Sequence, residues 1–197
     1  GMTFSALGYD SAHYGQVQWN GVAILSRVGI EDVSTGFGDG VIDPYEGDAR
    51  LIAGTCGDIR IVSVYVPNGR EVPSEFYDRK LEWFERLAEW VEADYKASDP
   101  LMILGDFNVA PEDRDVWNPN AFEGSTHLTA PERAAVARLV DWGLVDTFRR
   151  VYDQERLYSY WDYRAGDFHQ GRGMRIDLAL ATAPVAEYQL CFKCHSS

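Results

Sequence analysis

The amino-acid sequence predicts a single mixed domain of the α/β or α+β class, with layered sheets. Short segments with the hydrophobic pattern of strands interleave along the chain with longer segments of helical periodicity. This alternation is typical of layered α/β architectures. The length of 197 residues suffices for one sizeable hydrophobic core and does not require a second. We therefore expect residues 1–197 to form one domain.

The first half of the chain contains two predicted strands and a long helix. Residues 21–27 form an apolar run that predicts a buried strand, and residues 59–66 alternate like a half-buried one. The turn residues 67–69 end the second strand. Ser74 is a suitable N-cap for the helix that follows. The apolar residues of that helix fall on one face: Tyr77, Leu81, Phe84, Ala88 and Val91.

The second half repeats this alternation. Residues 101–104 predict a strand buried on both faces, and an irregular stretch rich in Pro, Asn and Asp covers residues 109–128. A second helix is expected to begin near Thr129 and to end before Gly143, a suitable residue after a helix C-terminus. The segment 157–163 and a loop at 164–173 follow, and residues 175–181 alternate like a strand.

Composition and charge exclude several classes of protein. The net charge of −13 argues against a basic protein that coats DNA, but not against an enzyme that meets phosphates through divalent cations. No apolar run approaches the length of a membrane span, and no signal peptide is recognised, so no membrane partner is expected. Three cysteines without a secretion signal favour a reducing cytoplasm. We therefore expect a cytoplasmic protein.

The cysteine-rich end of the chain matches one short motif. Residues 191–195 read C-x-x-C-H, the pattern of covalent haem attachment. Such attachment normally takes place in exported proteins, and no segment follows that would build a haem pocket. We interpret the two cysteines as incidental thiols, with haem binding as the remote alternative.

Polar groups at the end of the strand at 101–104 suggest a catalytic or metal-binding site. Asp106 and Asn108 follow that strand two positions apart, which places both side chains on one side of an extended chain. Oxygen ligands without His or Cys companions suit Mg²⁺ or Mn²⁺. The same two residue types also form turns by hydrogen bonding to their own backbone. Local sequence alone leaves both interpretations open.

Three other segments carry polar groups where a site could lie. Asp177 falls on the strand face opposite Leu178 and Leu180, where a carboxylate usually needs a partner. An edge strand with Asp177 in water is the alternative. A tyrosine hydroxyl is offered by Tyr65 in the segment 59–66. A second hydroxyl and aromatic surface are offered by Tyr160 with Trp161 in the segment 157–163.

Six motifs in order give the chain a specific resemblance. Together they resemble exodeoxyribonuclease III, in the endonuclease/exonuclease/phosphatase family that includes the apurinic/apyrimidinic (AP) endonucleases. The resemblance runs from about Phe4 to about Glu187 and implies a four-layer sandwich of two mixed β-sheets with helices outside. The motifs are 21-GVAILSR-27, 63-SVYVPNG-69, 102-MILGDFNVAP-111, 142-WGLVDTFR-149, 159-SYWDYR-164 and 173-GMRIDLALAT-182.

The resemblance assigns catalytic roles residue by residue. Asp106 corresponds to the carboxylate that positions or activates the attacking water, and Asn108 to the amide that holds this nucleophile and the scissile phosphate. Both are expected within reach of the metal ion. Tyr65 matches a tyrosine placed against the phosphate. Asp177 matches the acid that orients the family's catalytic histidine. The implied cofactor is Mg²⁺ or Mn²⁺.

The resemblance also implies a DNA-binding surface. Tyr160, with Met174 and Ile176, falls where the family forms an apolar pocket for a flipped-out abasic sugar, and Trp161 adjoins it. Each of the phosphate-contact candidates has an ordinary surface or rim role as its alternative. They are Asn68, Arg70, Arg164, Arg172 and Arg175.

The sequence departs from the family pattern at both ends. No strand before Phe4 carries the family's metal-binding Asn and Glu, and the closing S-D-H motif is missing, since no Asp precedes His195. His13, His127 and His169 lie in other contexts. We therefore expect an incomplete domain that binds Mg²⁺ weakly, and a homodimer formed through exposed sheet edges. Two functions remain open: a Mg²⁺-dependent nuclease of base-excision repair, or an inactive fragment of that family.

Overall fold

The protein is built around one six-stranded mixed β-sheet. A computed structural model describes residues 2–16, 20–38 and 49–187. The strand order is β3-β4-β5-β6-β10-β7, in which only β5 and β6 run parallel. The strands of this sheet are β3 (Glu31–Thr35), β4 (Leu51–Cys56), β5 (Ile59–Tyr65), β6 (Leu101–Asp106), β7 (Leu144–Asp146) and β10 (Asp177–Thr182).

A long helix makes the crossover between the two parallel strands. Helix α2 (Glu75–Asp94) begins after Ser74, whose side chain accepts a hydrogen bond from the Tyr77 amide. The predicted apolar face is confirmed at Tyr77, Phe84, Ala88 and Val91, whereas Leu81 is only partly buried. Parallel strands need such a crossover. Because α2 provides it, the C-terminal ends of β5 and β6 lie side by side.

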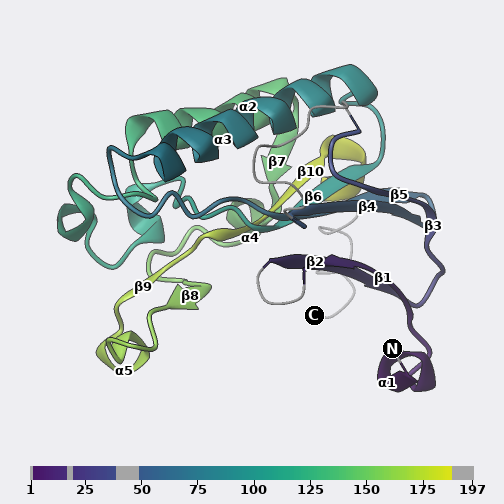
Figure 1. Cartoon of the computed structure of the whole chain (residues 1–197), viewed down its shortest axis with the longest axis horizontal. Coiled ribbons are helices and arrows are strands. Elements are labelled where there is room, and N and C mark those ends of the chain that lie inside the picture. The colour runs from purple at the N-terminus through teal and green to yellow at the C-terminus, as the bar shows by residue number, and fades with distance from the viewer. Residues whose placement is uncertain (1, 17–19, 39–48, 188–197) are drawn as a thin grey trace.

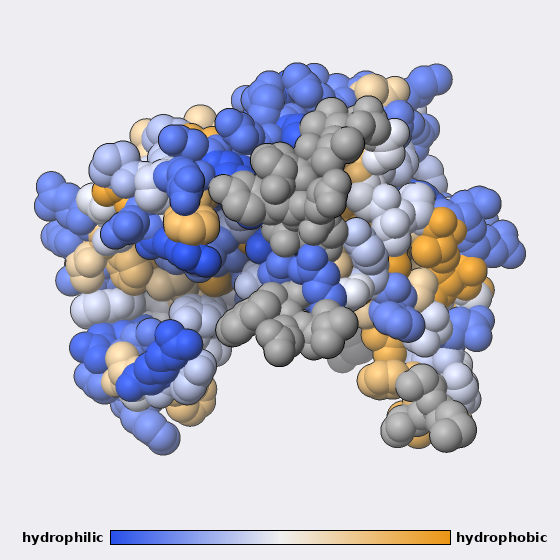
Figure 2. Space-filling view, in the orientation of Figure 1, coloured by the Kyte–Doolittle hydropathy of each residue, from blue (hydrophilic) through white to orange (hydrophobic). Residues whose placement is uncertain are grey.

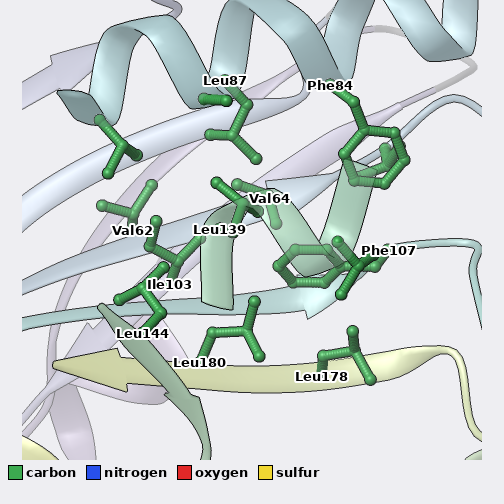
Figure 3. Packing of buried hydrophobic residues seen from close by; sticks show 14 of the residues in the cluster. Val62, Val64, Phe84, Leu87, Ile103, Phe107, Leu139, Leu144, Leu178 and Leu180 are labelled. Carbon is green, nitrogen blue, oxygen red and sulfur yellow. The ribbon is translucent and has the colours of Figure 1, made fainter. Parts of the chain in front are cut away.

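A second helix packs beside the first and completes one layer. Helix α3 (Ala130–Trp142) begins with a capping box, in which Thr129 and Glu132 bond to each other's backbone amides. It ends at Gly143 with φ of 133°, as the sequence predicts. Both helices lie over the same face of the sheet (Figure 1). Apolar side chains from the helices and the sheet meet in the main core between them, shown in Figure 3.

A two-stranded hairpin lies on the opposite face of the sheet. It consists of β1 (Asp10–Gly15) and β2 (Gly21–Ser26), which pair antiparallel. Val22 and Ile24 of β2 pack against Ile52 of the large sheet in a second apolar cluster. Exposed and buried residues alternate along β2, so the prediction of a fully buried strand at 21–27 is wrong. One face of this strand is exposed to solvent and the other packs against the large sheet.

Short elements connect and extend the helix layer, the large sheet and the hairpin. Strands β8 and β9 form a separate small antiparallel sheet. No helix of the described ranges combines the length and apolar character needed to cross a membrane. The short elements are α1 (Met2–Ala6), η1 (Asp113–Asp115), η2 (Pro119–Phe122), α4 (Thr147–Val151), β8 (Tyr160–Trp161), α5 (Asp167–Gln170) and β9 (Gly173–Met174).

The layers confirm the mixed α/β class that the sequence predicts. Within the described ranges, the second sheet is an antiparallel pair, so the four-layer sandwich of two mixed sheets stays a prediction. The segment 157–163 contains the two-residue strand Tyr160–Trp161, and the predicted strand at 175–181 begins at Asp177. The motif at 191–195 lies outside the described residues.

Candidate active site

Three polar side chains form a row across three inner strands of the sheet, at the end where β5 and β6 finish. Asp106, the last residue of β6, is directly opposite Tyr65 of β5 and Asp177 of β10 in the strand register. Residues paired in this way point to the same face, with Cβ atoms about 5 Å apart. That face is the one opposite α2 and α3, because the buried Leu178 and Leu180 of β10 point into the main core. The structure thus brings the predicted catalytic residues together.

Gly105 explains how β6 presents Asp106. Its φ of 141° lies outside the range that most residues adopt, and a Cβ there would fall 2.0 Å from the Val64 carbonyl oxygen. The backbones of β5 and β6 therefore approach each other at a point where only glycine fits. After Asp106 the chain turns, with Phe107 buried and Asn108 at φ of 51°.

The environment of Asp106 favours a carboxyl that titrates near neutral pH. Burial raises the pKa of Asp106 to about 6, helped by the charge of Asp177. A hydrogen bond from the Asn108 amide to Oδ1, at 2.8 Å, and the charge of Lys80 oppose this rise in pKa. Asp106 and Asp177 thus form a pair of adjacent carboxyl groups in the site.

Two asparagines are fixed beside Asp106 by hydrogen bonds. Asn68 donates from Nδ2 to Asn108 Oδ1 at 2.9 Å, and Asn108 donates from Nδ2 to the Val66 carbonyl at 2.9 Å. Asn68 Oδ1 also accepts from the Arg70 amide at 3.1 Å. Asn68 is exposed and Asn108 is buried. The turns that follow β5 and β6 are therefore joined through their side-chain amides.

A buried ionic cluster lies beneath these two turns. Lys80 of α2 and Glu132 of α3 form an ion pair with both side chains fully buried. Burial alone would raise the pKa of Glu132, but Lys80, Thr126 and the His127 amide together hold it below its usual range. Burial lowers the pKa of Lys80, and the ion pair opposes that effect. Glu132 accepts bonds from five donors, so it is a carboxylate.

His127 belongs to this cluster rather than to the acidic row. Its Nδ1 lies 2.6 Å from the Asn108 carbonyl oxygen, which can only accept, so Nδ1 carries the proton. Burial and the charge of Lys80 lower the pKa of His127 to about 4. The ring is therefore neutral at neutral pH and holds the turn after β6.

Asp177 is exposed and lies beside the segment 158–161, which contains two tyrosines and a tryptophan. At this residue β10 pairs with β6 alone, because its pairing with β7 begins at Leu180. The amide of Asp177 instead donates to Ser159 Oγ at 3.0 Å. Tyr160 is 40% exposed, and Trp161 packs edge-on against Tyr158. The loop that carries Tyr160 is thus tied to the strand end at Asp177.

Arg175 occupies the core rather than the surface. It is 2% exposed and binds Asp115 through Nε at 2.7 Å and Nη2 at 3.0 Å. Nη2 also pairs with Asp146 at 2.8 Å, while Arg149 binds the same Asp115. This buried network joins η1, β7, α4 and the segment between β9 and β10, so its role is to hold those parts of the chain together.

The remaining predicted contacts divide between the surface and an apolar cluster. Met174 and Ile176 are buried against Ala110 and Val116, so their side chains fill this region instead of lining an open pocket. Arg172 pairs with Asp167 at 2.7 Å. Arg70 lies over the ring of Phe76, and Arg164 lies beside Tyr163; both arginines are exposed.

The oxygen donors of the row fit part of a Mg²⁺ or Mn²⁺ site. Within the described ranges, no group of three acidic, His or Cys side chains is arranged to hold a metal ion. Mg²⁺ is commonly held by one or two carboxylates together with waters and substrate phosphates. Asp106 and Asp177 provide such a pair. The amide of Asn108 is already bonded to Asn68 and Val66, so its role as a ligand stays a prediction.

The sequence interpretation missed several residues around the site. Lys80, Glu132 and His127 support the turns, and Arg50 donates to the Tyr65 carbonyl at 3.2 Å with its guanidinium over the Tyr65 ring. Lys80 has a signal in hindsight, because it lies between Tyr77 and Phe84 on the apolar face of α2. A lysine on such a face needs a buried partner.

Comparisons with known proteins agree with this geometry. The family model of the Endonuclease/Exonuclease/phosphatase family matches residues 3–189. Exodeoxyribonuclease of Bacillus subtilis is 33% identical over 171 residues, which cover 86% of this chain and 66% of that protein. Exodeoxyribonuclease III of Haemophilus influenzae is 30% identical, covering 92% of this chain and 71% of that protein. The chain thus spans about two thirds of the length of these relatives.

Solved structures of similar proteins share the fold. An AP endonuclease from Archaeoglobus fulgidus superposes with a TM-score of 0.87 at 35% identity, over 94% of this chain and 71% of that one. The 3′ phosphatase NExo from Neisseria, bound to a product DNA hairpin, gives a TM-score of 0.88 at 33% identity, with the same coverage of the two chains. The chain therefore belongs to the endonuclease/exonuclease/phosphatase family, as an exonuclease III and AP endonuclease member.

Proposed function

We propose that this chain carries the catalytic centre of a Mg²⁺-dependent DNA phosphodiesterase that acts at abasic sites or 3′ ends in base-excision repair. The observation that carries the proposal is the row of Tyr65, Asp106 and Asp177 on three adjacent strands. Such a row places two carboxylates and a phenol close together at the ends of three inner strands. Family membership supports phosphodiester chemistry at that point.

Asp106 is the residue we assign to proton transfer. Its pKa of about 6 lies close to the working pH, where a general base is most effective. In hydrolysis, a water oxygen forms a bond to phosphorus while the bond to the leaving sugar oxygen breaks. Asp106 takes the proton that the water loses.

The neighbouring residues bind and orient the phosphate. Tyr65 offers a hydroxyl from the adjacent strand β5, and Asn68 presents an exposed amide from the turn that follows this strand. The Asn68–Asn108 hydrogen bond fixes that amide before substrate arrives, which lowers the entropy lost on binding. Exposed Arg70 and Arg164 lie on loops where they can meet the DNA backbone.

Asp106 and Asp177 are the residues that would hold a divalent cation. Bound there, the cation would polarise a phosphoryl oxygen and offset the charge that builds up on the scissile phosphate. It would also let a chain of net charge −13 approach DNA. We propose DNA as the substrate because a similar structure is bound to a DNA hairpin product.

Cleavage of a labelled duplex with one abasic analogue tests this function. We expect cleavage with Mg²⁺, none with EDTA, and a loss of about 1000-fold or more in Asp106→Asn, which cannot take up a proton. Asp58→Asn is the matched control, because Asp58 is exposed in the turn between β4 and β5, at the far end of the sheet. A duplex with a recessed 3′ end, tested in parallel, separates the two substrate classes.

An inactive scaffold is the alternative outcome. It is favoured by the small number of acidic and histidine groups near Asp106 in the described ranges. Folded protein that cleaves neither duplex under any metal condition would support it. Cleavage that persists in EDTA or in Asp106→Asn would contradict the assigned site.

A further inference from the structure

Lys80 places a fully buried ammonium group where three loops meet. Its Nζ donates to the carbonyl of Asn108 at 2.7 Å, to the carbonyl of Asn68 at 3.3 Å, and to Thr126 Oγ1 at 3.1 Å. It also forms the ion pair with Glu132. The loops after β5, after β6 and before α3 thus share one cation, which lies inside the protein and not in the acidic row.

The partners of Lys80 leave little freedom in this arrangement. Glu132 Oε1 accepts from Thr126 Oγ1 at 2.6 Å and from the His127 amide at 2.9 Å. A Cβ at Gly69 would lie 2.9 Å from Thr126 Oγ1 and 3.1 Å from Lys80 Cδ. The loop after β5 therefore packs directly on the lysine stem, and a shift of Lys80 would move that loop.

A buried ion pair is a poor way to gain stability alone. Taking both charges out of water is costly, and apolar residues of similar volume often replace such a pair without loss of stability. What an apolar pair cannot do is donate hydrogen bonds to two carbonyl groups. Those carbonyls belong to Asn68 and Asn108, whose side chains bond to each other beside Asp106.

We propose that Lys80 is a positioning residue for the active site, which fixes the spacing of Asn68 and Asn108 relative to Asp106. This role deepens the proposed phosphodiesterase function and rests on it for its effect on catalysis. Lys80 does not touch substrate; it acts through the two backbone carbonyls that it binds. His127 Nδ1 donates to the same Asn108 carbonyl and so holds it together with Lys80.

The decisive variant removes both charges together. Lys80→Met/Glu132→Gln keeps the approximate volumes and avoids leaving one buried charge unpaired. Arg138→Gln is the matched control: Arg138 also joins α3 to α2, through Glu85 at 2.5 Å and Glu92 at 2.9 Å, but at the surface. Thr126→Val, nearly the same shape, is the milder variant should the double variant fail to fold.

Two readouts separate positioning from general stability. In ¹⁵N-asparagine spectra we expect the side-chain amide signals of Asn68 and Asn108 to lose their hydrogen-bonded shifts in the double variant, and to change partly in Thr126→Val. The melting temperature should fall in the double variant, because the Asn68 and Asn108 carbonyls lose their donor. Spectra and kinetics are therefore recorded at a temperature where this variant and the Arg138→Gln control are both folded. In cleavage assays kcat should fall about 100-fold with little change in KM, since a misplacement near 1 Å has that effect.

The two proposals fail in distinguishable ways. A wild-type protein that cleaves no DNA overturns the proposed function, while the amide spectra still test whether Lys80 holds the asparagines. A folded double variant with unchanged amide signals and unchanged kcat overturns the role of Lys80. Equal losses in Lys80→Met/Glu132→Gln and Arg138→Gln would also overturn it, because they would indicate a contribution to helix packing alone.

Discussion

Asp106 combines a catalytic position with an unfavourable electrostatic environment. Its carboxylate is partly buried, faces Asp177 across the sheet, and has a pKa raised to about 6 by burial. A group held in this way destabilises the fold at neutral pH, because the charged form is favoured more in the unfolded chain. Residues selected for chemistry often carry such a cost.

We predict that Asp106→Asn stabilises the protein while it abolishes cleavage. The neutral amide removes a penalty on the order of 3 kcal/mol at pH 7.5, since the pKa rises from 3.8 to about 6 and each pKa unit corresponds to about 1.4 kcal/mol. Urea unfolding of both proteins without metal gives the comparison. Added Mg²⁺ should then stabilise the wild type only. A variant that is less stable than the wild type would show that the charge of Asp106 is well compensated.

His127 should make stability depend on pH in the opposite sense. Its pKa is about 4 in the fold and about 6.5 when unfolded, so the unfolded chain takes up the proton first. The free energy of unfolding therefore falls, by about 3 kcal/mol in total, as pH drops from about 6.5 to about 4. Asp106 acts in reverse between about 6 and 3.8, where the folded state takes up the proton first.

The Asp106→Asn background isolates this effect of His127. Urea midpoints measured there from pH 7.5 to pH 4.5 should fall more steeply than those of the same protein with His127→Asn added. Asparagine is a suitable control because it tolerates the φ of 84° at this position. Parallel curves for the two proteins would contradict the buried neutral imidazole.

At the residue scale, the sequence predicted the row of Tyr65, Asp106 and Asp177 better than the buried charged residues that hold the surrounding loops. Asp106 and Asp177 stand out as carboxylates at strand ends, and family motifs surround them. Lys80 looks like one charged residue of a helix until the fold shows which partners surround it. Arg175 resembles a phosphate contact in the same way, yet its partner Asp115 lies 60 residues away in the chain. Long-range pairing of charges is not encoded in local patterns.

At the scale of elements, the close approach of β5 and β6 at Gly105 determines how the next residue, Asp106, is presented. We predict that Gly105→Ala destabilises the protein by about 3 kcal/mol or more, because its Cβ would lie 2.0 Å from the Val64 carbonyl oxygen. Gly124→Ala is the matched control, with φ of 73° and open space around it, and should cost about 1 kcal/mol. Thermal unfolding measures both. Similar losses in the two variants would contradict the close approach.

Elements with clear local signals were predicted, and those that depend on neighbours were not. The helices follow from Ser74, from the capping box at Thr129 and from Gly143. Strand β4, the neighbour of β5, was missed because its sequence, LIAGTC, includes a central glycine that interrupts a strand pattern. Its place becomes evident only when β3 and β5 pair on either side of it.

At the scale of the molecule, the edges of the sheets bear on self-association. Edge strand β3 is acidic at Glu31 and Asp32 and has a register irregularity, and the other edge, β7, has three residues. Such features protect edges from pairing. Hydrophobic residues are visible in Figure 2 on the side where β1 and β3 lie. Leu25 of β2 and Val33 of β3 are exposed apolar residues.

The homodimer expected from sequence stays a prediction, and we place it on the exposed face of the β1–β2 hairpin. Sedimentation velocity over a 100-fold dilution should show a dimer that dissociates, and Ala23→Lys/Leu25→Lys on the exposed face of β2 should weaken it. Val140→Lys, on the exposed side of α3, is the control. A wild type that is monomeric at every concentration would contradict this prediction.

Divalent cation binding tests the central claim most directly, because it does not depend on turnover. Mn²⁺ bound per chain can be measured at pH 7.5 from the electron paramagnetic resonance signal of the free ion. We predict one site that Mg²⁺ displaces, that Asp58→Asn retains, and that Asp106→Asn/Asp177→Asn loses. Equal Mn²⁺ binding by the wild type and the double variant would contradict the claim that these two carboxylates form the metal-dependent centre.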